Sequence, residues 1–278
     1  LLMWFGERIN DKGIGNGISI VLLFNILSSL PDDLISLFNT FVRNDNIAVG
    51  VVMALIVAAC IAALFIFTIV LNDAKRVIPV QYSRKMQGRR QVGGNGSNIP
   101  LKVNTAGVMP VIFASSLMSI PSIISQFFNV DYSTIGGKIL MVMTSTYWCR
   151  ADYPWANIGL VIYLLLVYAF AYFYTSITFN PLEVANNMKK GGGFIPGLRP
   201  GKQTSDYLSN LLKYVIFIGA TGLSIVAIVP IAASGIFGLS HLSFTGTSLI
   251  IITSVIIETL KSLESQLLVR NYKGFLNE

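Results

Sequence analysis

The residues best suited to chemistry in this sequence are arginines that lie within two basic segments. The first segment, 72–102, contains seven Lys or Arg residues against a single acid, Asp73. Arg89 and Arg90 are adjacent near its middle, ahead of a glycine-rich stretch, 93–96, that favours a turn. Paired guanidinium groups near a loop tip suit the recognition of phosphate or carboxylate. This exposed loop is therefore predicted to contact a large, negatively charged partner, such as RNA or an acidic protein.

The second basic segment, Lys189–Thr204, reads KKGGGFIPGLRPGKQT. Its Gly201-Lys202 pair resembles the end of a phosphate-binding G-x-x-x-x-G-K-[ST] loop. The match fails because Gln203 follows the lysine and Pro196 occupies the position of the first glycine, and no strand is expected before it. Tight turns that present Arg199 are predicted instead from the residues Pro196, Gly197, Pro200 and Gly201.

Enzymatic and metal sites are not indicated by the remaining reactive residues. His241 is the single histidine, and the two cysteines, Cys60 and Cys149, have no metal-ligand spacing. No nucleophile motif or useful carboxylate pair occurs, and Glu258 is the one acid expected at membrane depth. Ion-coupled transporters usually place ionisable groups within their spans. The sequence therefore favours a passive pore or a binding scaffold, with no catalytic residue, metal or cofactor.

The elements that must position these residues are predicted to be membrane helices. The chain has 278 residues, of which 53% are hydrophobic and 12% charged, and its mean hydropathy is +0.66. Soluble domains carry about 25% charged residues. An all-α, polytopic bundle of six transmembrane helices is therefore expected. The predicted spans are Ile14–Leu30, Ile47–Leu71, Asn104–Phe128, Trp155–Thr178, Leu211–Ile231 and Thr247–Leu260.

The distribution of basic residues predicts how these helices are oriented. Seventeen of the twenty Lys and Arg residues fall on one side of the six spans: two before the first span, seven in the first basic segment, five after the fourth span (four in the second basic segment, and Lys213), and three in the tail. Arg43, Lys138 and Arg150 fall on the other side. By the positive-inside rule, both basic segments are cytoplasmic.

Four blocks of the sequence resemble the SecY family, the large subunits of Sec protein-conducting channels. They are WFGERINDKGIGNGIS (4–19), QGRRQVGG with NIPLKVNTAGVMPVIFASS (87–116), FYTSITFNPLEVANNMKKGGGFIPGLRPGKQT (173–204) and GTSLIII (246–252). The resemblance implies the second part of an inverted-repeat channel, from the end of span four to span ten. Because the chain begins with Leu, it is expected to be a piece of a longer protein, without the plug and the first four spans.

The resemblance implies a division of the chain into seven parts. These are the end of span four, a cytoplasmic linker and span five (1–30); an external loop and span six (31–71); a basic cytoplasmic loop (72–103); spans seven and eight with an external loop (104–178); a second cytoplasmic loop (179–210); spans nine and ten (211–260); and a cytoplasmic tail (261–278).

The resemblance also assigns residues to a pore. An apolar ring that seals the pore waist would comprise Ile18, Leu22, Ile112 and Ile251. Leu22 replaces the Ile found in many relatives, and it lies four residues after Ile18, on the same helix face.

A lateral gate, through which signal sequences reach lipid, would use polar groups of the seventh span. These groups belong to Asn104, Thr105, Ser115 and Ser116, while Pro110 would let the helix bend. Packing between helices would explain the same small polar residues equally well.

The implied function is that of the central pore subunit of a preprotein translocase in the bacterial plasma membrane. It would pass unfolded secretory proteins across the membrane and release membrane segments sideways. The implied partners are the small subunits SecE and SecG, the SecA motor ATPase, the ribosome through its RNA and nascent chain, signal peptides, and anionic lipids. Docking would use Lys75, Arg76, Arg84, Lys85, Arg89, Arg90, Arg199 and Lys202. Two alternatives are half of a secondary transporter, whose basic loops only set topology, and a lipid-binding scaffold.

Overall fold

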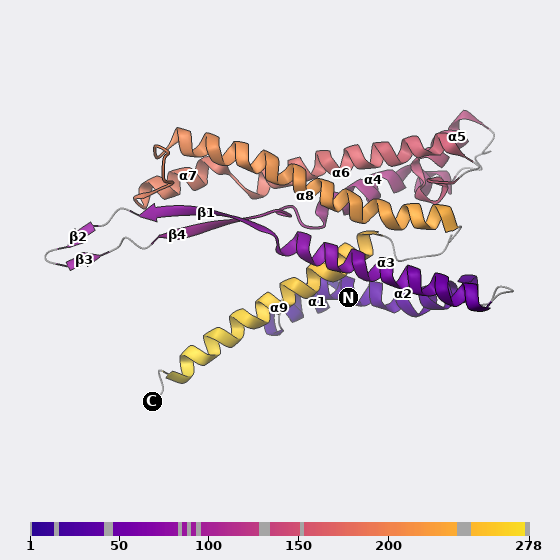
Figure 1. Cartoon of the computed structure of the whole chain (residues 1–278), viewed down its shortest axis with the longest axis horizontal. Coiled ribbons are helices and arrows are strands. Elements are labelled where there is room, and N and C mark those ends of the chain that lie inside the picture. The colour runs from indigo at the N-terminus through magenta and orange to yellow at the C-terminus, as the bar shows by residue number, and fades with distance from the viewer. Residues whose placement is uncertain are drawn as a thin grey trace. The chain divides into compact units, whose positions relative to one another are not determined.

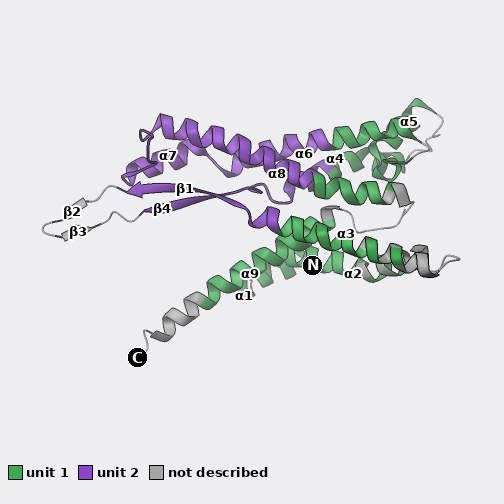
Figure 2. Cartoon of the chain, in the orientation of Figure 1, with its two compact units in different colours: residues 1–69, 115–163, 225–278 green, residues 70–114, 164–224 purple. Residues whose placement is uncertain are grey.

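The computed structural model describes residues 2–13, 17–41, 47–82, 85–87, 90–92, 96–127, 134–150, 153–237 and 246–275. These residues form two compact units (Figure 2). Unit 1 comprises Leu1–Ile69, Ser115–Tyr163 and Ile225–Glu278, and unit 2 comprises Val70–Ala114 and Leu164–Ser224. Each unit is described separately below.

Most of the described chain is helical (Figure 1). The α-helices are α1 (Leu2–Lys12), α2 (Gly17–Phe41), α3 (Ile47–Asp73), α4 (Met109–Ser125), α5 (Ile135–Met143), α6 (Asn157–Thr178), α7 (Pro181–Lys190), α8 (Lys202–Phe237) and α9 (Gly246–Phe275). Two short 3₁₀ turns, η1 (Ser145–Tyr147) and η2 (Pro154–Ala156), precede α6. The expectation of a membrane helix bundle is confirmed.

The six predicted spans fall on α2, α3, α4, α6, α8 and α9, although several helix ends differ from the prediction. Helix α2 continues through Pro31 to Phe41, and α4 begins five residues later than expected. Two helical stretches of the described chain, Pro154–Lys190 and Lys202–Ala233, are long and apolar enough to cross a bilayer. Shorter apolar helices cover Ser19–Ser29, Ala58–Asp73 and Met109–Ser125. The count of six spans stays a prediction.

The first basic segment, predicted to be a loop, contains strands. The strands are β1 (Lys75–Tyr82), β2 (Lys85–Gln87), β3 (Arg90–Val92) and β4 (Ser97–Lys102), and the second basic segment adds β5 (Gly193–Phe194). A three-stranded sheet has the order β4-β1-β5. In addition, β2 pairs with β3, and β1, β2, β3 and β4 are labelled in Figure 1. Because β5 lies before the Gly201-Lys202 pair, the expectation that no strand precedes this pair is wrong.

The register of the β1–β4 ladder explains how the sheet tolerates two prolines. Pro79 pairs with Asn98, and Pro100 pairs with Val77. The ladder continues to Ala74, whose carbonyl accepts from the Val103 N–H at 2.9 Å. Opposed residues in an antiparallel ladder alternate between hydrogen-bonded and non-hydrogen-bonded pairs. Because Ala74 and Val103 form a hydrogen-bonded pair, the odd-numbered positions of β1 belong to non-hydrogen-bonded pairs. Both prolines therefore occupy positions where no N–H is required.

The two faces of the sheet have opposite environments. Ile78, Val80 and Leu101 share one face and are 3%, 1% and 3% exposed. They form one apolar cluster with the helix and turn residues Met188, Ile195 and Leu208, and Ile99 and Phe179 pack against it. The odd-numbered side chains of β1 are exposed on the other face. Alternate burial of this kind fixes the register of the strands.

In unit 1, α1 packs against α2, and α2 packs against α9. The Asn10 side chain joins α1 to α2 by accepting from the Gly17 N–H at 2.7 Å. Trp148 is 2% exposed, and its Nε1 donates to the Val142 carbonyl at 2.7 Å. Gly159 is required near this indole, because a Cβ there would lie 2.5 Å from Trp148 Nε1.

The buried face of the sheet generates a prediction with a matched control. Val80→Ala removes buried methyl groups and is expected to destabilise the sheet by about 2 kcal/mol. Val77→Ala, on the exposed face of the same strand, is expected to cost less than about 0.5 kcal/mol. Hydrogen exchange of the β1 and β4 amides in the membrane-embedded protein measures both effects. Exchange about 30-fold faster in Val80→Ala alone is the expected result; equal rates in the two variants would contradict the assigned faces.

Candidate functional site

The two basic segments are joined in one sheet of unit 2. Gln81 pairs with Phe194, and Tyr82 pairs with Gly193, so β5 extends the sheet that β1 and β4 form. Gly193 is buried, and a Cβ there would lie 2.9 Å from the Tyr82 ring. Only glycine lets the strands approach so closely at this position. The segments therefore make one surface rather than two independent loops.

Helix α7 holds two lysines beside this sheet. Asn180 caps the helix, because its Oδ1 accepts from the backbone N–H groups of Leu182 and Glu183 at 3.1 and 3.4 Å. Lys189 and Lys190 occupy the last turn, where positive charge interacts favourably with the helix dipole. Met188 on the same helix anchors it in the apolar cluster under the sheet.

The turn that carries Arg199 is fixed by backbone geometry and side-chain hydrogen bonds. Gly197 and Gly201 have φ values of +86° and +112°, which favour glycine. The Arg199 N–H donates to Gln203 Oε1 at 3.4 Å. The Arg199 carbonyl accepts from Thr204 Oγ1 at 2.9 Å. The guanidinium group stays exposed, so the predicted turns and the presentation of Arg199 are confirmed.

The surface of unit 2 concentrates positive charge. Its described, exposed cations are Lys75, Arg76, Lys102, Lys189, Lys190, Arg199, Lys202 and Lys213. Asp73, Glu183 and Asp206 are the exposed acids described in this unit, and Asp73 lies 4.0 Å from the Lys75 ammonium. Lys75 and Lys102 are directly opposite each other across the ladder. Like charges at such a position are destabilising, so this pair does not stabilise the sheet.

The described docking residues predicted from the sequence lie on the following elements. Lys75 and Arg76 lie on β1, and Arg199 and Lys202 lie at the turn before α8 and at the start of α8. Lys85 and Arg90 begin the short strands β2 and β3, where Arg90 pairs with Gln87. Arg84 and Arg89 lie outside the described residues, as does His241.

The sequence prediction missed four cations that the fold adds to this surface, and one of them is Lys213 on α8. Lys102 faces Lys75 through the strand register, and Lys189 and Lys190 are carried by a helix that was not predicted. The capping pattern Asn-Pro-x-Glu at 180–183 was the available indication of that helix.

Two of the predicted gate residues are not on a helix. Asn104 and Thr105 precede α4, which begins at Met109. Asn104 is 7% exposed, and its Nδ2 donates to Asn72 Oδ1 at the end of α3, at 2.7 Å. Thr105 Oγ1 donates to the Lys102 carbonyl at 2.7 Å. These bonds lie at the end of the β1–β4 ladder that is next to α3. Because neither residue is on α4, the expectation that both belong to the seventh span is wrong.

The other expected gate features lie on α4. Ser115 is half-buried and Ser116 is exposed. Pro110 occupies the second position of the helix, where proline replaces no helical hydrogen bond. The expectation that Pro110 lets α4 bend is therefore wrong. The proline inside this helix is Pro121. The gate role of Ser115 and Ser116 stays a prediction.

The predicted ring residues occur in both units. Ile18 and Leu22 lie on α2, and Ile251 lies on α9, which packs against α2 in unit 1. Leu22 is 44% exposed, while Ile251 is half-buried. Ile112 lies on the part of α4 that belongs to unit 2. The grouping of all four residues stays a prediction.

Comparisons with known proteins identify the family of this chain. The family model for SecY matches residues 1–260. The chain belongs to the SecY family. It is 45% identical to the protein translocase subunit SecY of Streptomyces galbus over 99% of its length. The corresponding proteins of Halalkalibacterium halodurans and Chlamydia trachomatis are 38% and 41% identical to it. The chain spans about three fifths of the length of these SecY relatives.

Solved structures support the fold of this SecY chain. A structure described as that of a protein conducting channel matches with a TM-score of 0.57 and 17% identity, over 95% of this chain and 62% of that one. A second, from work on the plug domain that stabilises the closed state of a SecY channel, has a TM-score of 0.55 and 16% identity, with the same coverage. At such identities the likeness shows the fold alone.

The turn around Arg199 generates a prediction. Gly201→Ala places a side chain on a backbone with φ near +112°. The stability of the turn is therefore expected to fall by about 1–3 kcal/mol. The Ser205 N–H, which donates to the Gly201 carbonyl, should then exchange at least fivefold faster. Gly136→Ala, at an exposed helical position with open space around it, is the control and should be neutral or stabilising. Unchanged exchange at Ser205 would contradict the requirement for glycine at position 201.

Proposed function

We propose that this chain forms part of the pore subunit of a bacterial preprotein translocase. In this role it passes unfolded secretory proteins across the plasma membrane and releases membrane segments sideways into lipid. The supporting observation is the family match over residues 1–260, together with relatives named as protein translocase subunits. The remaining two fifths of the subunit would complete the pore wall.

The pore function rests on apolar and polar side chains with distinct tasks. Ile18, Leu22, Ile112 and Ile251 form a flexible apolar ring that excludes ions while a chain passes. Hydrocarbon side chains suit this task because they offer ions no ligand to replace water. Ser115 and Ser116 on α4 belong to the gate through which signal peptides reach lipid.

The basic surface of unit 2 is the docking platform on the cytoplasmic side. Lys75, Arg76 and Lys102 lie on a sheet that is anchored by an apolar cluster, and the other exposed cations lie on α7, on α8 and in the turn before α8. A rigid array of cations binds an extended anionic surface with little loss of conformational entropy. Ribosomal RNA offers phosphates and the SecA motor offers carboxylates, so both can dock here. Anionic lipids contact the lysines nearest the membrane.

The small subunits SecE and SecG are proposed as further partners within the membrane. The described helices leave many large apolar side chains exposed, such as Leu55, Ile66 and Leu165. Lipid and neighbouring membrane helices cover such surfaces. This part of the proposal rests on the family relationship.

Charge reversal at the two arginine sites tests the docking role. Arg89→Glu with Arg90→Glu, combined with Arg199→Glu, is expected to abolish ribosome binding by the complete translocase, because each arginine lost costs about 1.5–3 kcal/mol. Arg199→Ala alone is expected to lower SecA-driven transport about tenfold or more while changing ribosome affinity less. Co-sedimentation with ribosomes and transport into vesicles measure the two effects.

The control is the same change of charge at Lys138, an exposed lysine on α5. Lys138→Glu and Lys138→Ala should leave both activities unchanged. Full motor-driven transport by Arg199→Ala would contradict the assignment of Arg199. Normal ribosome binding by the triple variant would favour the alternative in which the basic segments only set topology.

A further inference from the structure

A cavity of about 230 Å³ lies within unit 1, lined by residues of α4, α5, α6 and α8 and of the turn after α5. An engineered apolar cavity of about 150 Å³ binds benzene, and sites for drug-sized ligands begin at about 300 Å³. The space is therefore suited to one small organic molecule. All of its lining residues belong to unit 1.

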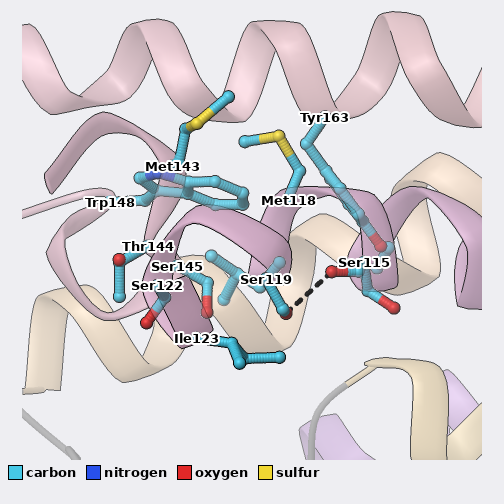
Figure 3. A pocket seen from close by; sticks show the side chains of 12 residues that line it. Ser115, Met118, Ser119, Ser122, Ile123, Met143, Thr144, Ser145, Trp148 and Tyr163 are labelled. Atoms are coloured by element: carbon cyan, nitrogen blue, oxygen red, sulfur yellow. Dashed lines mark hydrogen bonds between the residues drawn. The ribbon is translucent and has the colours of Figure 1, made fainter. Parts of the chain in front are cut away.

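The lining combines apolar surface with hydroxyl groups and carries no charge among the described residues. Met118, Met143 and the Trp148 indole supply the apolar surface, and Ser122, Ser145 and Tyr163 supply hydroxyls (Figure 3). Methionine side chains adapt their shape and make favourable contacts with aromatic rings. A charged ligand would lose its hydration without gaining a counter-ion here, so the lining favours an uncharged molecule.

Tyr163 is the group in this cavity that calls for a ligand. Its side chain is 3% exposed, and its ring packs 5.6 Å from the Trp148 ring. Within the described part of the chain, no group pairs with its hydroxyl. Two neighbouring polar groups are already satisfied: Trp148 Nε1 donates to the Val142 carbonyl, and Thr144 Oγ1 donates to the Leu140 carbonyl. Buried hydroxyls nearly always have a hydrogen-bond partner, so a molecule in the cavity is expected to provide it.

We propose that this cavity binds a small uncharged alcohol. The hydroxyl of the ligand exchanges a hydrogen bond with Tyr163 Oη, and its hydrocarbon part lies against Met118, Met143 and Trp148. Water alone would satisfy Tyr163 but would leave the methionine and indole surfaces wet. An alcohol satisfies both requirements, and alcohols partition readily into membranes. The site is separate from the basic surface of unit 2 and does not depend on the proposed docking function.

Photolabelling of the complete translocase in vesicles tests this site. The probe is a diazirine derivative of 1-octanol, and labelled residues are located by mass spectrometry. Label is expected on Met118, Met143, Trp148 or Tyr163, and excess 1-octanol should block it more effectively than octane. Tyr163→Phe should raise the 1-octanol concentration needed for half-blocking about fivefold, the effect expected from loss of one hydrogen bond.

Two further variants keep the result interpretable. Tyr214→Phe changes a tyrosine that is 74% exposed in unit 2 and should leave labelling unchanged. Ser122→Leu fills the cavity from α4 and should abolish labelling there. Labelling spread over lipid-facing helices, equal blocking by octane and 1-octanol, or no response to Tyr163→Phe would each contradict the proposed site. Absence of label, as expected if water alone or another segment fills the cavity, would also contradict it.

Discussion

The burial of one face of a small sheet is the interaction on which the basic surface of this chain depends. Neighbouring cations on that surface repel each other, by about 1 kcal/mol per pair at 4 Å in water and less in salt. Each side chain buried beneath the sheet contributes about 1.5–3 kcal/mol. Ile78, Val80 and Leu101 meet Met188, Ile195 and Leu208 in that layer. The hydrophobic contribution therefore exceeds the repulsion and holds the charges in a fixed array.

This arrangement connects the helices to the basic surface that is proposed to bind partners. Helices satisfy their own backbone groups, whereas an extended segment needs partners from another part of the chain or from water. Strand pairing provides them for the first basic segment, and the Asn72–Asn104 hydrogen bond fastens its base. The second segment joins the same sheet through Tyr82 and Gly193. A partner that binds Arg199 therefore contacts a body that is continuous with the first segment.

Much of the helical architecture was predictable from sequence, and most of the sheet was not. A long uncharged run such as 47–71 predicts a helix from composition alone, and α3 confirms it. Strand β1 carries Pro79, its partner β4 carries Pro100, and the alternation covers few residues, so the segment reads as a loop. The pairing of Tyr82 with Gly193 joins distant parts of the chain, and no local pattern indicates it. Turn residues did predict the presentation of Arg199, because glycine and proline act locally.

Disulfide cross-linking between β1 and β5 tests most directly whether the two basic segments form one folded surface. Gln81→Cys and Phe194→Cys place thiols at register partners, whose expected Cα separation of about 4.5–5.5 Å permits a disulfide. In complete protein with Cys60 and Cys149 replaced by Ala, rapid cross-linking of this pair is expected. The pair Val77→Cys and Phe194→Cys, four residues out of register, should not react. Equal or absent cross-linking in both pairs would contradict the account.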